Sequence, residues 1–191
     1  MSTLAIVQAR MTSTRFPGKV LAPLAGKPMV IRQLERIQRA RTLDAVVVAT
    51  SSDPSDDELA AVIERAGVPV VRGSLDDVLA RFIAAIDVFE PDTVVRLTAD
   101  CPLTSAAVID LVVEAFRASG ADYASNTMTP TYPDGLDVEV VKASVLRKVA
   151  EVASDPAERE HVTLGVYRRH DQYRIENVAA ALDLSSLRWT V

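Results

Sequence analysis

A loop near the N-terminus combines cations, hydroxyls and a glycine in a mixture that suits a chain of phosphates. Between Gln8 and Lys19 it reads QARMTSTRFPGK. Arginine offers forked donors to phosphate oxygens, lysine adds a mobile charge, and backbone N–H groups beside a glycine can approach an anion closely. It is not a Walker loop, because the pattern GxxxxGK followed by Ser or Thr is absent. The residues favour triphosphate binding over the alternative, a solvated basic surface loop.

An aspartate follows the apolar run TVVRLT at residues 93–98, which is predicted to be a buried strand. Asp100 would therefore lie at the carboxyl end of a sheet strand, where ligands bind in α/β proteins. Mg²⁺ prefers carboxylate oxygens together with phosphates and water, so this position suits a metal ligand. An aspartate that only caps the loop is the alternative. Cys101 is expected to be a small packed residue, because a catalytic thiol needs a base and His161 is the one plausible helper.

Two further polar clusters lie in the second half of the chain. Asp134, Asp137 and Glu139 crowd one turn and the strand after it, which suggests a cation or a hydroxyl-rich ligand, although a solvated turn is the ordinary explanation. Asn126 and Tyr132 belong to the same long loop. Residues 158–163 read EREHVT, but no second histidine lies at metal-ligand spacing, which argues against zinc. This stretch could order a ligand site or form a dimer contact, and both remain open.

The elements that must position these residues follow an alternating pattern. Strands are expected at residues 4–7, 45–50, 68–71 and 93–98, with helices at 28–39, 55–66, 75–89 and 106–118. Such alternation implies an α/β protein with a mostly parallel sheet and helices on both faces. The later chain predicts a polar loop at 126–135, a half-exposed strand at 136–141, a helical stretch at 144–169 broken near Asp155, and strands at 173–178 and 187–191. No repeat or linker interrupts residues 1–191, so a single domain is expected.

The charge balance limits the kinds of partner. A net charge of −5 gives the whole molecule no nucleic-acid footprint, although residues 1–41 are basic and indicate a local anion site. No apolar run approaches the ~20 residues needed to cross a bilayer, so no membrane partner is expected. The single cysteine cannot form an internal disulfide, and a cytoplasmic location is expected.

The motifs, taken in order, resemble those of the CMP–sugar cytidylyltransferases, whose parent members activate 3-deoxy-manno-octulosonate or sialic acids. The match begins with Arg10-x-x-Ser13-x-Arg15-x-Pro17-Gly18-Lys19 and with GKPM at 26–29. The branch named for spore-coat polysaccharide synthesis protein F is especially similar, because its pattern QARMxSTRxPGKVL is present almost letter for letter. Further stretches follow to the end of the chain: VATS at 48–51, RGSxDDVLxR at 72–81, RLTADCPL at 96–103, SNT at 125–127, YPDGLDVE at 132–139, EREHVT at 158–163 and LRWTV at 187–191.

The resemblance implies a nucleotide-diphospho-sugar-transferase-like sandwich, which is GT-A-like and Rossmann-like. It also implies transfer of CMP from CTP to an acidic sugar, with release of pyrophosphate, for surface polysaccharide synthesis. It assigns nucleotide binding to Ala9, Arg10, Ser13, Arg15, Lys19, Gly73, Ser74 and Arg81; Arg81 could instead pair with Asp77 one helical turn earlier. It assigns catalysis to Arg10, Lys19 and Asp100, with Asp100 also binding Mg²⁺. The sugar is expected at Asn126, Tyr132, Asp134, Asp137 and Glu139, and a homodimer is expected.

The sequence departs from the resembled family at its end. In that family LRWTV continues into a segment like Asp-x-Pro-Glu-Asp, whose first aspartate is a metal ligand, whereas this sequence ends at Val191. We therefore expect a domain that lacks its C-terminal segment, binds CTP and turns over poorly. Two alternatives remain. One is a GT-A glycosyltransferase, which would usually carry Asp-x-Asp where this chain has TADC at 98–101; the other is a non-catalytic nucleotide-binding remnant. No residue stands out as a general base.

Overall fold

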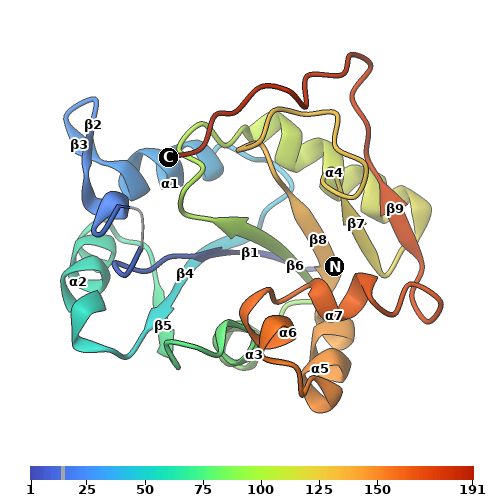
Figure 1. Ribbon diagram of the computed structural model, residues 1–191, viewed down its shortest axis with the longest axis horizontal. Coiled ribbons are helices and arrows are strands. Elements are labelled where there is room, and N and C mark those ends of the chain that lie inside the picture. Colours follow the sequence, from blue (N-terminus) through green and yellow to red (C-terminus); the bar gives the residue numbers. More distant parts are fainter. Residues whose placement is uncertain (14–15) are drawn as a thin grey trace.

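The computed structural model describes residues 1–13 and 16–191, and this part of the chain forms a seven-stranded sheet with helices on both faces (Figure 1). In sheet order the strands are β5 (Val70–Gly73), β4 (Ala45–Ser51), β1 (Thr3–Gln8), β6 (Thr93–Thr98), β8 (Glu139–Lys142), β7 (Tyr123–Ser125) and β9 (Ile175–Asn177). Neighbouring strands are parallel from β5 to β6 and between β7 and β9, whereas β8 is antiparallel to both β6 and β7. The predicted mostly parallel sheet flanked by helices is confirmed.

Strand β1 lies inside the sheet, and its side chains enter both apolar layers. Successive side chains of a strand point to opposite faces, and here Leu4 and Ile6 belong to one buried cluster while Ala5 and Val7 belong to the other. The first cluster includes residues of α3 (Val78–Phe89), α5 (Ala143–Val152) and α7 (Leu164–Tyr167). The second includes residues of α1 (Met29–Ile37), α2 (Asp57–Arg65) and α4 (Ala106–Ser119). The sheet is therefore covered on both faces, as a parallel sheet requires.

Aspartate caps decide where two helices begin. Asp77 Oδ1 accepts a hydrogen bond from Ala80 N at 2.8 Å, so α3 starts at Val78 and not at residue 75 as predicted. Asp155 Oδ1 accepts from Ala157 N at 2.9 Å, with Pro156 opening α6 (Pro156–Glu160). Each cap satisfies an N–H group that the helix cannot pair, which contributes about 1 kcal/mol. The predicted break near Asp155 is confirmed.

Two strand predictions need correction, and strand β7 was not predicted. Residues 187–191 form no strand, and a single bridge joins Arg188 to Asp134. Strand β8 is buried and not half-exposed, because α4 and α5 pack against it. Strand β7 was missed, since three residues are too few to show an alternating pattern. Two short strands, β2 (Pro23–Leu24) and β3 (Lys27–Pro28), form a separate hairpin before α1.

The C-terminal segment, residues 183–191, crosses the loop at 131–135 and ends beside the loop that follows β6 (Figure 1). Asp134 N donates to Leu187 O at 3.0 Å, and Trp189 N donates to Asp134 O at 2.7 Å. Gly135 permits this crossing, because its φ is +109° and an added Cβ would lie 2.9 Å from the carbonyl of Trp189. Among the residues described, no helix is both long and apolar enough to span a bilayer.

Gly135→Ala should therefore weaken the fold more than a substitution that only strains the backbone. Positive φ costs an alanine about 1–2 kcal/mol, and the clash with Trp189 should add at least ~1 kcal/mol more. Gly67→Ala is the matched control, since Gly67 has φ +76° but nothing within 4 Å of an added Cβ. Urea unfolding of both variants, followed by tryptophan fluorescence, measures the two losses. Equal losses would contradict the close crossing at Gly135.

Candidate active site

The carboxyl ends of β1 and β6 meet at a switch point of the sheet. Strand β1 pairs in parallel with β4 on one side and with β6 on the other, and ligands of open α/β sheets bind where the strand order reverses. A cavity of about 260 Å³, which we call the phosphate-loop cavity, opens at this point. Its lining residues come from the first loop and from the end of β6: Gln8, Ala9, Arg10, Thr12, Ser13, Lys19, Val20, Thr98, Ala99 and Asp100. The structure thus brings together Ala9, Arg10, Ser13, Lys19 and Asp100, as the sequence predicts.

The first loop is anchored to the sheet by Asp56, whose side chain is fully buried. Asp56 Oδ1 accepts from Met11 N at 2.7 Å, and Oδ2 accepts from the backbone N and the hydroxyl of Ser51. Farther along the loop, Gly18 N donates to Met11 O at 2.9 Å, and its φ of +73° suits a glycine. The loop is therefore closed at Met11. Arg15 lies outside the described residues, so its assignment to the phosphates stays a prediction.

Lys19 and Asp100 face each other across the phosphate-loop cavity. Lys19 Nζ lies 3.4 Å from Asp100 Oδ2 and donates to Val191 O at 2.8 Å. Burial acts to raise the pKa of Asp100, but the hydrogen bond from the Thr98 side chain and the charge of Lys19 outweigh it and hold that pKa below its usual value. Asp100 is therefore ionised at neutral pH. A bound phosphate would offer Lys19 a stronger partner and release this carboxylate for another cation.

Cys101 does not take part in this chemistry. Its side chain is 4% exposed, and burial raises the pKa of its thiol to about 12. A thiol with so high a pKa has almost no nucleophilic thiolate at neutral pH. The prediction that Cys101 is a packed residue is confirmed.

A smaller cavity of about 140 Å³, the Arg81 cavity, adjoins the first one at the end of β1. It is lined by Gln8, Ala9, Arg10, Val78, Arg81, Glu160 and His161, of which the first three also line the phosphate-loop cavity. Arg10 Nη2 lies 3.8 Å from Glu160 Oε1 at the rim. Gly73 packs against the stem of Arg81, and the hydroxyl of Ser74 accepts from Asp77 N at 3.1 Å. Gly73 and Ser74 thus support the start of α3 beside this cavity.

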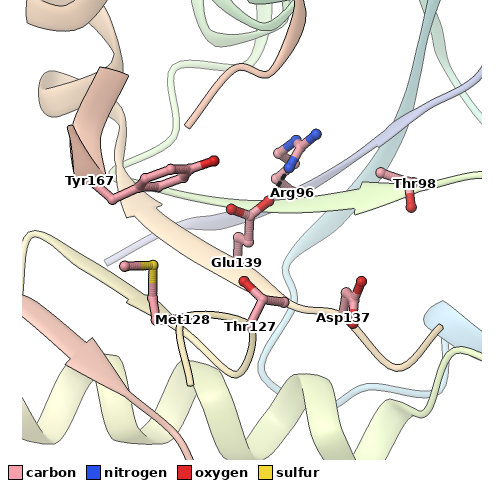
Figure 2. Close-up of a pocket in the computed structure, with 7 residues that line it drawn as sticks. All are labelled: Arg96, Thr98, Thr127, Met128, Asp137, Glu139 and Tyr167. Atoms are coloured by element: carbon pink, nitrogen blue, oxygen red, sulfur yellow. Dashed lines mark hydrogen bonds and ion pairs between the residues drawn. The ribbon is translucent and has the colours of Figure 1, made fainter. Parts of the chain in front are cut away.

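A third cavity of about 400 Å³, the Arg96 cavity (Figure 2), shares Thr98 with the phosphate-loop cavity. Arg96 and Glu139 form a buried ion pair at its floor. Glu139 Oε1 also accepts from the hydroxyls of Tyr123 and Thr163, each at 2.6 Å. Burial, followed by the charge of Glu139, raises the pKa of Tyr123 well above its usual value, so Tyr123 remains a donor. The network holds the Glu139 carboxylate rigidly in place.

The predicted sugar residues separate into two groups. Asp137 and Glu139 line the Arg96 cavity together with Thr127, Met128 and Tyr167 (Figure 2). Asn126 instead supports the loop, because its amide donates to Leu136 O at 2.9 Å and accepts from Val138 N at 2.8 Å. Asp134 is exposed and pairs with Arg188, and Tyr132 is half-buried in the same loop.

Several lining residues escaped the sequence analysis. The sequence did carry a signal for Arg96, which is a charged residue within the otherwise apolar strand at 93–98. A charged residue in such a strand is rarely buried without a partner. Thr98 separates two cavities, yet a threonine at the end of a strand carries no distinguishing signal. Tyr167 reaches the Arg96 cavity from α7, a contact between distant parts of the chain that no local pattern predicts.

The residues around Asp100 fit a Mg²⁺ ion only in combination with a phosphate ligand. No group of three or more histidine, cysteine or acidic side chains that could hold a metal occurs among residues 1–13 and 16–191. Mg²⁺ commonly uses one or two carboxylates together with substrate phosphates and water. Asp100 supplies one ionised carboxylate beside a cavity lined with phosphate-binding groups.

The sheet order and this loop define a nucleotidyltransferase-like α/β fold, and comparisons with known proteins agree. A cytidylyltransferase family model matches residues 4–185. The spore coat polysaccharide biosynthesis protein SpsF of Bacillus subtilis is 35% identical over 182 residues, which span 93% of this chain and 75% of that protein. The 3-deoxy-manno-octulosonate cytidylyltransferase 2 of Hydrogenovibrio crunogenus is 32% identical over 157 residues, which span 80% of this chain and 62% of that protein.

A comparison with a solved structure also indicates a cytidylyltransferase. The cytidylyltransferase from Leptospira borgpetersenii superposes with a TM-score of 0.95 at 32% identity, covering 100% of this chain and 81% of that one. The chain belongs to the cytidylyltransferase family.

The acids of the Arg96 cavity should make stability depend on pH. Although Asp137 keeps part of its surface exposed, loss of hydration, followed by the charges of Asp134 and Glu139, raises its pKa from 3.8 to about 6. The native state then binds this proton more tightly than the unfolded state, so the free energy of unfolding falls as pH rises from about 4 to about 6. Asp137→Asn should remove this fall and be more stable than the parent protein at pH 7.

Urea unfolding across this pH range measures the effect. Asp76→Asn is the control, because Asp76 is an exposed acid just before α3 and its loss should leave the fall intact. If the free energy of unfolding of Asp137→Asn depends on pH as it does in the parent protein, the raised pKa of Asp137 is wrong.

Proposed function

We propose that the protein transfers CMP from CTP to an acidic sugar and releases pyrophosphate, for the synthesis of a surface polysaccharide. The observation that carries the proposal is the meeting of three cavities at the ends of β1 and β6. The middle one holds the cations and hydroxyls that suit a triphosphate; the Arg96 cavity shares Thr98 with it, and the Arg81 cavity shares three residues with it. Membership of the cytidylyltransferase family supports CMP as the group that is transferred. The similarity to a 3-deoxy-manno-octulosonate cytidylyltransferase supports an acidic sugar as the acceptor.

The arrangement suits in-line displacement at the α-phosphorus. The triphosphate lies over the first loop, with Arg10, Ser13 and Lys19 around the β- and γ-phosphates and Arg15 assigned to the same role. The acceptor sugar approaches from the Arg96 cavity past Thr98, where its hydroxyl oxygen attacks the α-phosphorus. The bond from that phosphorus to the bridging oxygen breaks, and Arg10 and Lys19 stabilise the departing pyrophosphate. Mg²⁺ held by Asp100 would neutralise phosphate charge and lower the pKa of the attacking hydroxyl.

Pyrophosphate release tests this function. The protein would be incubated with CTP, Mg²⁺ and a panel of sugars that includes 3-deoxy-manno-octulosonate and neutral controls. Release that requires both CTP and an acidic sugar is expected. CTP binding without turnover on any sugar would instead favour a non-catalytic nucleotide-binding protein.

Lys19→Ala should weaken CTP binding by roughly tenfold or more, since a charge-assisted contact to phosphate contributes about 1.5–3 kcal/mol. Lys27→Ala is the matched control, because Lys27 lies in the β2–β3 hairpin and pairs with Glu35. Titration calorimetry with CTP measures both. Equal affinities for the two variants would remove Lys19 from the triphosphate site.

Asp100→Asn should keep the fold but abolish the effect of Mg²⁺ on CTP binding, because the amide lacks the charge that Mg²⁺ requires. Asp92→Asn is the control at the opposite end of β6, where the carboxylate accepts from Ser2 N. CTP affinity would be measured for both with Mg²⁺ and with EDTA. A collapse of thermal stability in Asp100→Asn would show instead that this carboxylate is structural.

A further inference from the structure

We infer that Gln33 is a positioning residue, whose buried amide ties α1 to both ends of the loop at residues 98–104 and so fixes the place of Asp100 beside the phosphate-loop cavity. We call residues 98–104 the Asp100 loop. The inference rests on the proposed function and goes further, because it names a residue outside the lining of the three cavities that acts on the reaction through Asp100.

The side chain of Gln33 holds the Asp100 loop at two points. It is fully buried, and its Nε2 donates to Thr98 O at 2.8 Å and to Thr104 Oγ1 at 3.1 Å. A carbonyl oxygen can only accept, so the bond to Thr98 fixes which end of the amide carries the donors. One planar group thus joins the first and the last residue of the loop.

Thr104 passes this constraint on to the residue next to Asp100. Its hydroxyl, which accepts from Gln33, donates to Cys101 O at 2.6 Å, and Thr104 N donates to the same oxygen at 3.0 Å. Cys101 Sγ in turn lies 3.6 Å from Asp100 Oδ1. Loss of the Gln33 amide would therefore loosen the backbone that carries the Asp100 carboxylate.

The other end of the amide indicates that Gln33 serves geometry more than stability. Its Oε1 is buried and accepts no hydrogen bond among the described residues. A buried polar atom without a partner costs free energy. Local features that reduce stability tend to lie at functional sites. The remaining buried positions of α1 are all apolar: Met29, Val30, Leu34 and Ile37.

Helix α1 also supports the segment that carries Lys19. Its first residue, Met29, donates from its backbone N to Ala22 O at 2.9 Å, shortly after Lys19 in the chain. Lys19 Nζ lies 3.4 Å from Asp100 Oδ2. One helix therefore braces both groups that face each other across the phosphate-loop cavity, and Gln33 connects it to the acidic one.

A second side chain of α1 reaches only one end of the Asp100 loop. Arg36 lies about one turn after Gln33, and it donates from Nε to Thr104 O at 2.9 Å and from Nη2 to Leu103 O at 3.2 Å. These bonds hold the end that is distant from β6. Within the described part of the chain, Gln33 is thus the side chain of α1 that bonds to both ends.

Gln33→Met removes the amide donors with little change in side-chain length, and the single cysteine reports on the loop without any ligand. Cys101 is 4% exposed, so its reaction with iodoacetamide under native conditions requires the Asp100 loop to open. Alkylation of Gln33→Met should be roughly five- to thirtyfold faster than that of the parent protein, as expected when one or two hydrogen bonds no longer oppose a local opening.

Asp122→Ala is the control for a general loss of stability. The Asp122 carboxylate accepts from Lys142 Nζ at 2.7 Å and from Arg174 N at 3.0 Å, at the opposite end of the sheet. This variant should be alkylated at the parent's rate. An equal acceleration in Asp122→Ala would overturn the inference.

Calorimetry with CTP relates the loop to the site. In EDTA, Gln33→Met should bind CTP as the parent protein does, because the first loop keeps its cations. The Mg²⁺ concentration that gives half of the gain in CTP affinity should rise roughly tenfold or more, as is typical when a group that orients a metal ligand is lost. A role in stability alone would not separate these two conditions.

Alkylation of Gln33→Met at the parent's rate overturns the inference, and so does faster alkylation with an unchanged Mg²⁺ requirement. If Gln33→Met does not fold, Thr104→Val takes its place, because it removes the hydroxyl that accepts from Gln33 and donates to Cys101 O, and the same two shifts are expected. Failure of the parent protein to bind any nucleotide overturns the proposed function, whereas the alkylation rates still decide whether Gln33 holds the loop.

Discussion

Strand β1 between β4 and β6 is the constraint on which the site depends. Parallel pairing on both sides places three carboxyl ends at one edge of the sheet, and the segments that leave β1 and β6 must diverge there. The backbone extends this alignment beyond the strands, because Ala9 N donates to Ala49 O and Ala99 N donates to Gln8 O. The first loop and Asp100 are consequently brought together although they are far apart in sequence.

Buried charges around this edge are satisfied to different degrees. Asp56 and Glu139 are each surrounded by donors, and both hold neighbouring segments rigidly. Such networks stabilise a unique arrangement only when every member has a partner. Arg81 departs from this pattern beside a cavity, and local departures of this kind tend to occur where a protein meets its ligand. A buried charge whose hydrogen bonds are all made within the protein is thus expected to be structural, whereas one with unpaired donors beside a cavity is expected to bind a ligand.

The sequence predicted the parallel half of the sheet because each of its strands is a short apolar run followed by a helix. It also predicted that Lys19 and Asp100 lie close together, since a cationic loop after one parallel strand and an acid after another meet at the same sheet edge, and both line one cavity. The half beyond β6 was less predictable. Strand β7 has three residues, and β8 owes its burial to α4 and α5, which local periodicity does not reveal. The Arg96–Glu139 pair likewise depends on the register of two antiparallel strands.

The hydrogen bond between Lys19 and Val191 has a consequence for how the molecule is made. It joins positions 172 residues apart. Chains emerge from the ribosome at roughly 5–20 residues per second, so on the order of 10–30 s separates the appearance of these two residues. Long-range contacts of this kind also form late in folding, because the entropy of closing the loop must be overcome first. The strands from β1 to β6 can pair during synthesis, whereas Lys19 gains this hydrogen bond only after residue 191 has emerged.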